Sequence, residues 1–200
     1  MLSAVEQLLK LLVNRSYRWD PVNKFKLASG KLSDYYLECK LTTFYATALP
    51  LVGEVLFEMV KEHTSLSGRQ AVAAVGGLTQ GADPLALATS YYSAIQGDPI
   101  QAFSVRKEPK QHGARRWIEG CVNPGDAVFV LDDVVTTGGS TIQAIRTCRK
   151  EELDVRGALV LVDREEDNGL MNIQTELGGD LPVLSVFKRT EITDRARRQS

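Results

Sequence analysis

The sequence has little cysteine and no long apolar run. Its three cysteines, Cys39, Cys121 and Cys148, stand far apart, which fits neither a disulfide framework nor a zinc site. Reduced thiols are typical of the cytoplasm, so we expect a cytoplasmic protein. No stretch approaches the roughly 18 apolar residues that a membrane span needs. Glu6 and Lys10 interrupt the apolar pattern of the N-terminal segment, which predicts an amphipathic helix rather than a signal peptide.

An excess of one charge sign is also missing. The chain has 24 Lys and Arg against 25 Asp and Glu, so we expect neither nucleic acid nor a membrane as a partner. Basic residues gather only locally, at 106–116 and at 195–198, and the second cluster predicts a frayed, solvated tail. A chain of 200 residues that is 44% hydrophobic suits one α/β domain over residues 1–200.

Short apolar runs alternate with helical patterns along most of the chain. Ser3 and Glu6 form a capping box for the first helix, and further helices are expected over 46–62 and 83–95, the last with Pro84 at its first position. Residues 25–37 predict two short strands around a turn. The apolar runs with strand character are 71–75, 100–105, 127–131, 158–162 and 183–187. Their βαβ-like order predicts a parallel sheet with helices on both sides.

The sharpest motif follows the run at 127–131. That strand is expected to end at Leu131, directly before Asp132 and Asp133. The loop then continues through Val134, Val135, Thr136, Thr137, Gly138, Gly139 and Ser140. A helix follows, for which Ser140 is the expected N-cap with Gln143 as its partner. Glycines allow the backbone to approach a ligand closely, and the N–H groups of a helix start attract an anion.

The two carboxylates make this anion site more specific. P-loops that bind nucleotides carry a lysine after the glycines, and this loop has none. A phosphate beside two carboxylates suggests a ligand whose phosphate neighbours hydroxyls or a metal. Ribose 5-phosphate has that layout, with Asp132 and Asp133 accepting hydrogen bonds from the 2′ and 3′ hydroxyls directly or through Mg²⁺ and water. The plain alternative is a strand–turn–helix connection with an acidic cap, which the length of the run disfavours. The run resembles the PRPP-binding motif of the type I phosphoribosyltransferases, where PRPP is 5-phosphoribosyl 1-pyrophosphate.

A basic segment lies between two of the predicted strands. Within 104–120 it contains Arg106, Lys107, Lys110 and His112, with Gly113 breaking regular structure. Such cations could close over a pyrophosphate and exclude water. A solvated basic surface loop explains the same residues, and the segment by itself leaves both interpretations open.

Together these segments resemble the orotate phosphoribosyltransferases. The pattern R-K-E-x-K-x-H-G is similar to the catalytic loop of that family, and FKLASGKLSDYYLECK, VGGLTQGADPLA and LVDREE resemble three further family segments in the family's order. The matches cover residues 25–166. The resemblance implies a type I phosphoribosyltransferase fold, which is a Rossmann-like parallel sheet flanked by helices, with a small N-terminal hood of short strands and helix.

The resemblance also implies a reaction. Orotate and PRPP would give orotidine 5′-monophosphate and pyrophosphate with Mg²⁺, a step of de novo pyrimidine (UMP) biosynthesis. Substitution at the ribose anomeric carbon would pass through an oxocarbenium-like state, in which the protein orients the reactants and stabilises charge.

The residue roles follow the family motifs. Thr136, Arg164 and Tyr36 would bind orotate, with Arg164 on its carboxylate. Arg106, Lys110 and His112 would hold the pyrophosphate, and Lys107 would serve the neighbouring subunit of a homodimer. The PRPP-binding residues would be Asp132, Asp133, Val134, Val135, Thr136, Thr137, Gly138, Gly139 and Ser140. No side chain is expected to bind metal directly, because Mg²⁺ would be bound through PRPP.

Some positions depart from the family pattern. Ala28 and the pair Thr79-Gln80 stand where lysine and Tyr-Lys are common, and Lys26 or Lys40 could compensate. Two alternatives remain open: a phosphoribosyltransferase for another base, and a non-enzymatic PRPP-binding regulator. A plain dinucleotide-binding fold is disfavoured, because the G-x-G-x-x-G spacing is absent.

Overall fold

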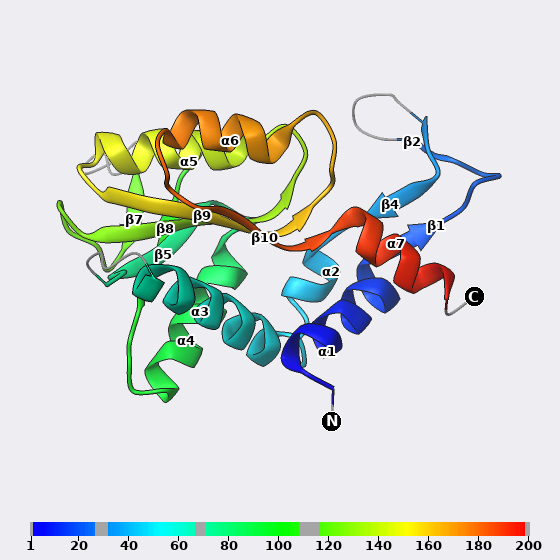
Figure 1. The fold of residues 1–200 in the computed structure, drawn as a ribbon, viewed down its shortest axis with the longest axis horizontal. Helices are drawn as coiled ribbons and strands as arrows, with labels where there is room; N and C mark the ends of the chain where they lie inside the picture. Colours follow the sequence, from blue (N-terminus) through cyan, green and yellow to red (C-terminus); the bar gives the residue numbers. More distant parts are fainter. Residues whose placement is uncertain (1, 27–31, 67–70, 109–116, 199–200) are drawn as a thin grey trace.

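The computed structural model describes residues 2–26, 32–66, 71–108 and 117–198. A mixed sheet lies between two layers of helices. A group of short strands, β1, β2 and β4 among them, lies beside the sheet, next to α7 (Figure 1). In the described chain this sheet has six strands in the order β10-β9-β8-β5-β6-β7. All neighbours pair in parallel except β7, which is antiparallel to β6. The strands of the sheet are β5 Ala74–Leu78, β6 Gln101–Val105, β7 Ile118–Gly120, β8 Ala127–Val135, β9 Asp154–Asp163 and β10 Val183–Lys188.

Helices cover both faces of this sheet. On one face lie α5 and α6, and on the other α3, α4 and α1 (Figure 1). The helices are α1 Ala4–Leu11, the π-helical turn η1 Leu12–Ser16, α2 Lys40–Thr43, α3 Leu49–Leu66, α4 Asp83–Ile95, α5 Gly139–Lys150, α6 Gly169–Leu177 and α7 Arg189–Arg197. The predicted bounds of α4 and the capping box of α1 are confirmed, since the Ser3 hydroxyl accepts from the Glu6 N–H at 3.2 Å. No helix among the described residues is long and apolar enough to cross a membrane.

The central strands are buried on both faces, as their unbroken apolar runs predict. Along β8, Val128 and Val130 belong to the core beneath α5 and α6. Phe129 and Leu131 belong to the core beneath α1, α3 and α4. Side chains alternate between the faces of a strand, so the central strands contribute to both cores and connect the two helical layers.

The N-terminal hood consists of two small antiparallel pairs. β1 (Tyr17–Trp19) pairs with β4 (Tyr35–Leu37), and β2 (Phe25–Lys26) pairs with β3 (Leu32–Ser33). The expected strands in 25–37 are therefore present. The turn between them, including Ala28, lies outside the described residues.

Several predictions need correction. Strand β5 spans Ala74–Leu78 rather than 71–75, and α3 spans Leu49–Leu66 rather than 46–62. The strand expected to end at Leu131 continues to Val135, because its pairing with β9 extends to Val135 opposite Asp163. The expected frayed tail at 195–198 is mostly helical, because α7 buries Ile192 against the main core. The basic segment 104–120, for which a loop is expected, contains strand β7 at its end.

Candidate active site

The candidate site lies where the order of the parallel strands reverses. After β5 the chain passes to β6 on one side and then to β8 on the other. Open α/β sheets bind ligands at the carboxyl end of such a switch point. A Cβ atom at Gly81, in the turn after β5, would come within 2.6 Å of Asp133 Oδ1 on β8. Glycine at this position therefore lets the turn close directly over the carboxylates.

Asp132 and Asp133 lie within β8 rather than after it, and each is only 5% exposed. Thr141 Oγ1 donates to Asp132 Oδ2 at 2.8 Å, and the N–H of Asp133 donates to Asp132 Oδ1 at 3.1 Å. Burial raises the pKa of Asp132 to about 7, and the Asp133 charge adds to this rise. Burial also raises the pKa of Asp133. The negative charge of the pair is therefore poorly compensated within the protein, and the two carboxylates are suited to bind hydroxyl groups or a cation.

Asp133 Oδ2 is the carboxylate oxygen of this pair whose hydrogen-bonding capacity is unused. It is buried and accepts no hydrogen bond within the described part of the chain. Lys40 Nζ, from α2, lies 4.0 Å away and also 3.7 Å from Glu38 Oε1. Of the two lysines considered as compensation, Lys40 is thus the one at the carboxylates, whereas Lys26 is exposed on β2.

Magnesium fits this donor set through its outer sphere. Hard cations prefer oxygen ligands, and Mg²⁺ usually keeps several waters while binding one or two carboxylates and substrate phosphates. Two adjacent carboxylates with an unpartnered oxygen suit that arrangement. No group of three or more His, Cys, Asp or Glu side chains suited to a metal ion occurs among the residues described.

The glycine-rich turn begins helix α5 differently from the prediction. Gly138, at φ +82°, is the N-cap, and the helix begins at Gly139, so Ser140 is already inside the first turn. The left-handed backbone conformation of Gly138 explains why the helix begins here, because residues with a side chain rarely adopt this conformation. Thr137 Oγ1 accepts from the Gly139 N–H at 3.3 Å, and Asn172 Nδ2 of α6 donates to Thr137 O at 3.0 Å. Thr137 and Ser140 are exposed at the positive end of α5.

Arg164 follows β9 at the same edge of the sheet. Its side chain is 16% exposed, and its Nε and Nη2 donate to the hydroxyl of Tyr35 at 3.2 and 3.1 Å. Tyr36 lies on the other side of β4, where its ring is 5.9 Å from that of Phe25 and its hydroxyl is 3.3 Å from Glu38 Oε2. The structure therefore brings Tyr35, which sequence reasoning missed, to Arg164. The only signal was the Tyr-Tyr pair itself, which does not say which ring faces inward.

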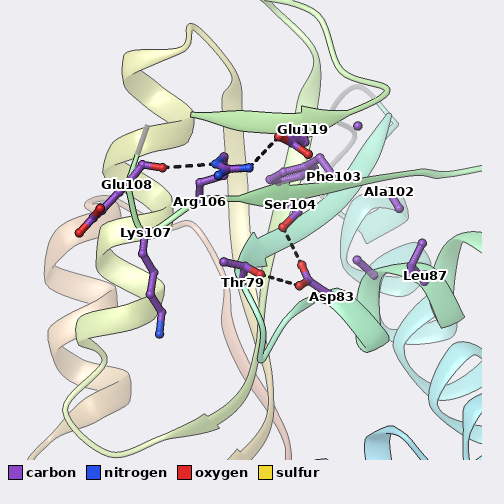
Figure 2. Close-up of a pocket in the computed structure, with 12 residues that line it drawn as sticks. Thr79, Asp83, Leu87, Ala102, Phe103, Ser104, Arg106, Lys107, Glu108 and Glu119 are labelled. Atoms are coloured by element: carbon purple, nitrogen blue, oxygen red, sulfur yellow. Dashed lines mark hydrogen bonds and ion pairs between the residues drawn. The ribbon is translucent and has the colours of Figure 1, made fainter. Parts of the chain in front are cut away.

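A cleft of about 890 Å³ opens beyond the β5–α4 turn. Figure 2 shows Arg106 between Glu119 and Glu108, with Nη1 2.9 Å from Glu119 Oε1. The Lys107 side chain is exposed at the same rim. Lys110 and His112 lie outside the described residues, so the structure tests neither position.

Asp83 is a second residue that sequence reasoning missed. It is the first residue of α4, and its two oxygens accept from Thr79 Oγ1 and Ser104 Oγ, both at 2.7 Å (Figure 2). These bonds join the turn after β5 to strand β6. An acid at a helix start is an ordinary capping signal, which concealed this bridging position.

Comparison with known proteins agrees with this geometry. The orotate phosphoribosyltransferase of Aquifex aeolicus is 45% identical over 94% of this chain and 96% of its own. The crystal structure of Mycobacterium tuberculosis orotate phosphoribosyltransferase in complex with Fe(III) dicitrate matches with a TM-score of 0.77 at 31% identity, over 94% of this chain and 98% of that one. The same enzyme in complex with PRPP matches with a TM-score of 0.73 at 29% identity, over 95% and 99%. A scan against models of protein families gave no match.

The sheet order and the buried carboxylates before a glycine-capped helix are those of a type I phosphoribosyltransferase. The relatives named orotate phosphoribosyltransferase identify the family within this class, because their sequence similarity extends through nearly the whole chain. The chain belongs to the orotate phosphoribosyltransferase family.

Proposed function

We propose that this protein transfers the 5-phosphoribosyl group of PRPP to orotate in de novo pyrimidine biosynthesis. The observation that carries this proposal is the buried pair Asp132 and Asp133 beside the glycine-capped start of α5. The PRPP-bound relative has the same fold over 95% of this chain. The products are orotidine 5′-monophosphate and pyrophosphate.

PRPP would lie across the switch point of the sheet. Its 5-phosphate would accept hydrogen bonds from the N–H groups at the start of α5 and from the hydroxyls of Thr136, Thr137 and Ser140. Its ribose hydroxyls would donate to Asp132 and Asp133. Asp133 Oδ2 supports this arrangement, because a buried oxygen without a partner is costly until a donor reaches it.

Mg²⁺ would accompany PRPP at the carboxylate pair. Asp132 and Asp133 would hold it through water, and the ion would supply positive charge beside the pyrophosphate. Arg106 at the cleft, together with Lys110 and His112, would bind the leaving pyrophosphate. In the transfer the bond from the anomeric carbon to the pyrophosphate oxygen breaks, and a bond to the orotate ring nitrogen forms. Because orotate is already an anion, this substitution needs no strong base.

Orotate would bind at the end of β9. The guanidinium of Arg164 suits a carboxylate, with which it can form two parallel hydrogen bonds. Thr136, in the turn that follows β8, would also contact orotate. Tyr36 stays a predicted orotate residue, but its ring lies near Phe25 on the other side of β4 from Tyr35, so Arg164 and Thr136 carry this part of the proposal.

We further propose that the protein is a cytoplasmic homodimer. Large apolar side chains of the α2–α4 side are exposed: Phe44 at 63%, Leu87 at 64% and Tyr91 at 70%. They line an apolar cavity of about 690 Å³ that also includes Pro50. Exposed apolar patches of this kind are typical of interfaces. Leu87 and Asp83 line both this cavity and the cleft of Arg106, so a catalytic segment could reach a neighbouring subunit. Three free cysteines suit a reducing compartment.

The test is an orotate-depletion assay with purified protein, PRPP and Mg²⁺, followed by orotate's ultraviolet absorbance. We expect depletion that needs all three components. A Lys110→Ala variant should lose most of the rate while retaining the fold, because its role is to stabilise the leaving pyrophosphate.

Two other outcomes would favour the alternatives. PRPP binding with turnover of a different base would indicate a phosphoribosyltransferase for that base. PRPP binding without turnover of any base would indicate a non-enzymatic regulator.

A further inference from the structure

Arg164 is held along one edge of its guanidinium group. Tyr35 Oη accepts from Nε at 3.2 Å and from Nη2 at 3.1 Å, and Glu166 Oε2 lies 3.4 Å from Nε. The Tyr35 hydroxyl in turn donates to Glu166 Oε1. No hydrogen bond reaches Nη1 from the described residues. The arginine is therefore anchored by its Nε edge, and its outer edge is open to a ligand.

The two anchoring residues are themselves fixed by distant parts of the chain. Tyr35 is 7% exposed and stacks on Tyr17, with ring centroids 6.0 Å apart. Glu166 lies in a segment with positive φ at Glu165, +57°, and Asp167, +49°. Non-glycine residues in this backbone region need support from their surroundings.

Helix α7 provides part of that support. Glu165 Oε2 accepts from the Thr190 N–H at 2.9 Å, and Arg189 Nε donates to Arg164 O at 3.1 Å. The Arg189 guanidinium also lies 5.5 Å from the centre of the Tyr35 ring. Residues from the hood, from the end of β9 and from α7 thus surround Arg164 and its partner Tyr35. An arginine on the surface would not need such extensive support.

We propose that Tyr35 and Glu166 are positioning residues that hold the Nε edge of Arg164, so that its outer edge selects a pyrimidine carrying a carboxylate. This inference rests on the proposed function. A free arginine loses much rotamer freedom when it binds, and an arginine already held in place loses less. Selectivity for orotate over an uncharged pyrimidine such as uracil then depends on this anchoring, although neither residue touches the base.

We expect the hydrogen bond between Tyr35 and Glu166 to matter more for the anchoring than the 3.4 Å ion pair of Glu166 with Arg164. Glutamine at this position keeps an oxygen that can accept from Tyr35, whereas alanine leaves the hydroxyl without that acceptor. Phenylalanine at position 35 keeps the ring and its stacking but removes both hydrogen bonds to Arg164. These variants therefore disturb the orientation of the Arg164 guanidinium while they keep the packing of the Tyr35 ring.

The experiment measures kcat and KM for orotate and PRPP, and kcat/KM for uracil. Tyr35→Phe and Glu166→Ala should raise KM for orotate about tenfold, because a loosened Arg164 should bind the carboxylate less tightly by about the free energy of one hydrogen bond to a charged group. The preference for orotate over uracil should fall by a similar factor, with KM for PRPP unchanged. Glu166→Gln should restore most of the preference that Glu166→Ala loses.

Tyr17→Phe is the matched control. Its hydroxyl is 2.9 Å from Thr193 Oγ1 and does not contact Arg164, so its loss weakens the same hood without affecting the guanidinium. We expect a lower unfolding temperature and an unchanged preference for orotate.

The outcomes separate this inference from the function on which it rests. Absence of orotate turnover in the unmodified protein would contradict the proposed function itself. An active protein in which Tyr35→Phe and Glu166→Ala keep the original preference would overturn the inference. So would an equal loss of preference in Tyr17→Phe, because a loosened hood would then explain the effect.

Discussion

At the scale of single residues, burial decides the charge of Asp132. The side chain lies in the interior with one hydroxyl donor and one N–H donor, which stabilise the carboxylate only in part. Its pKa in the folded protein is therefore raised from the ordinary 3.8 to about 7. Between these two values the folded chain holds a proton that the unfolded chain releases. The free energy of unfolding should consequently decrease as pH rises from about 4 to 7.

Replacing this carboxyl with a neutral amide should remove the decrease. A rise from 3.8 to about 7 corresponds to at most roughly 4 kcal/mol, at about 1.4 kcal/mol per pH unit. Asparagine keeps an acceptor for Thr141 but loses the one for the Asp133 N–H. We therefore expect ligand-free Asp132→Asn to be more stable than the original by about 1–3 kcal/mol at pH 8. Urea unfolding at pH 8 and at pH 4 measures this difference.

The pH dependence of that gain is the decisive part. At pH 4 both forms are neutral in the folded state, so the gain should vanish. Asp180→Asn, a change at an exposed aspartate before β10, should be neutral at both pH values. If Asp132→Asn raised the stability equally at pH 4 and pH 8, or lowered it at pH 8, burial of the charged carboxylate would not be the cause of the effect.

Sequence reasoning located the chemistry of the site better than the orientation of its side chains. The run from Asp132 to Ser140 could be predicted because glycines and hydroxyls at a strand end have few other uses. Tyr35 could not be separated from Tyr36, because contacts with Tyr17 and Arg164, outside this strand, decide which ring faces inward. Strands of three residues show too little alternation to fix that choice.

At the scale of elements, the junction of β8 and α5 shows why the cap prediction failed. Ser140 with Gln143 has the composition of a capping box, yet the N-cap lies two residues earlier, at Gly138. A Cβ atom there would meet Gly169 O and Ile173 Cγ1, both at 2.9 Å. Contact with α6 therefore fixes where the helix begins, and local sequence does not report that contact.

Gly138→Ala tests this explanation. The substitution combines a strained φ of +82° with two close contacts, so we expect a loss of about 1–3 kcal/mol in the free energy of unfolding. Gly139→Ala is the matched control, because its Cβ atom would meet only Thr137 Oγ1 at an ordinary 3.5 Å. Urea unfolding of the ligand-free proteins measures both. Equal losses in the two variants would refute a special requirement at Gly138.

The turn between β5 and α4 depends on Asp83 in a similar way. Asp83→Ala removes the acceptor for Thr79 and Ser104, which frees the turn that covers Asp133. We expect KM for PRPP to rise about tenfold, a cost comparable to one lost hydrogen bond to a charged group. KM for orotate should change little, because Arg164 follows another strand, β9. Steady-state kinetics with each substrate varied would contradict this if both KM values rose together.

At the scale of the whole molecule, the sheet and its helices could be predicted from the sequence. The contact between the N-terminal hood and the C-terminal helix α7 could not. The apolar runs predicted strands buried on both faces, and the structure confirms this for the central strands β5, β8 and β9, whereas β6 and β10 are partly exposed. The hood could not be assembled in advance, because the Tyr17–Thr193 hydrogen bond joins residues 176 positions apart. The edge strand β7 was missed since it has three residues and an exposed pattern.

Sharing of active sites between subunits is a property of the whole assembly. If Lys107 serves the neighbouring subunit while Asp133 serves its own, Lys107→Ala and Asp133→Asn should each be nearly inactive alone. Subunits of the two variants, coexpressed with different tags, should form mixed dimers in which one of the two sites carries neither change. Random pairing gives mixed dimers in half of the molecules, so activity should return to about one quarter of the original.

The control pairs two changes that belong to the same subunit's site. Coexpressed Asp133→Asn and Arg164→Ala leave no site intact in the mixed dimer, so activity should remain absent. Recovery with Lys107→Ala but not with Arg164→Ala would assign Lys107 to the neighbouring subunit. Failure of recovery in purified mixed dimers would mean that each loop serves its own subunit, and the apolar face of Phe44, Leu87 and Tyr91 would then join subunits that do not exchange catalytic residues.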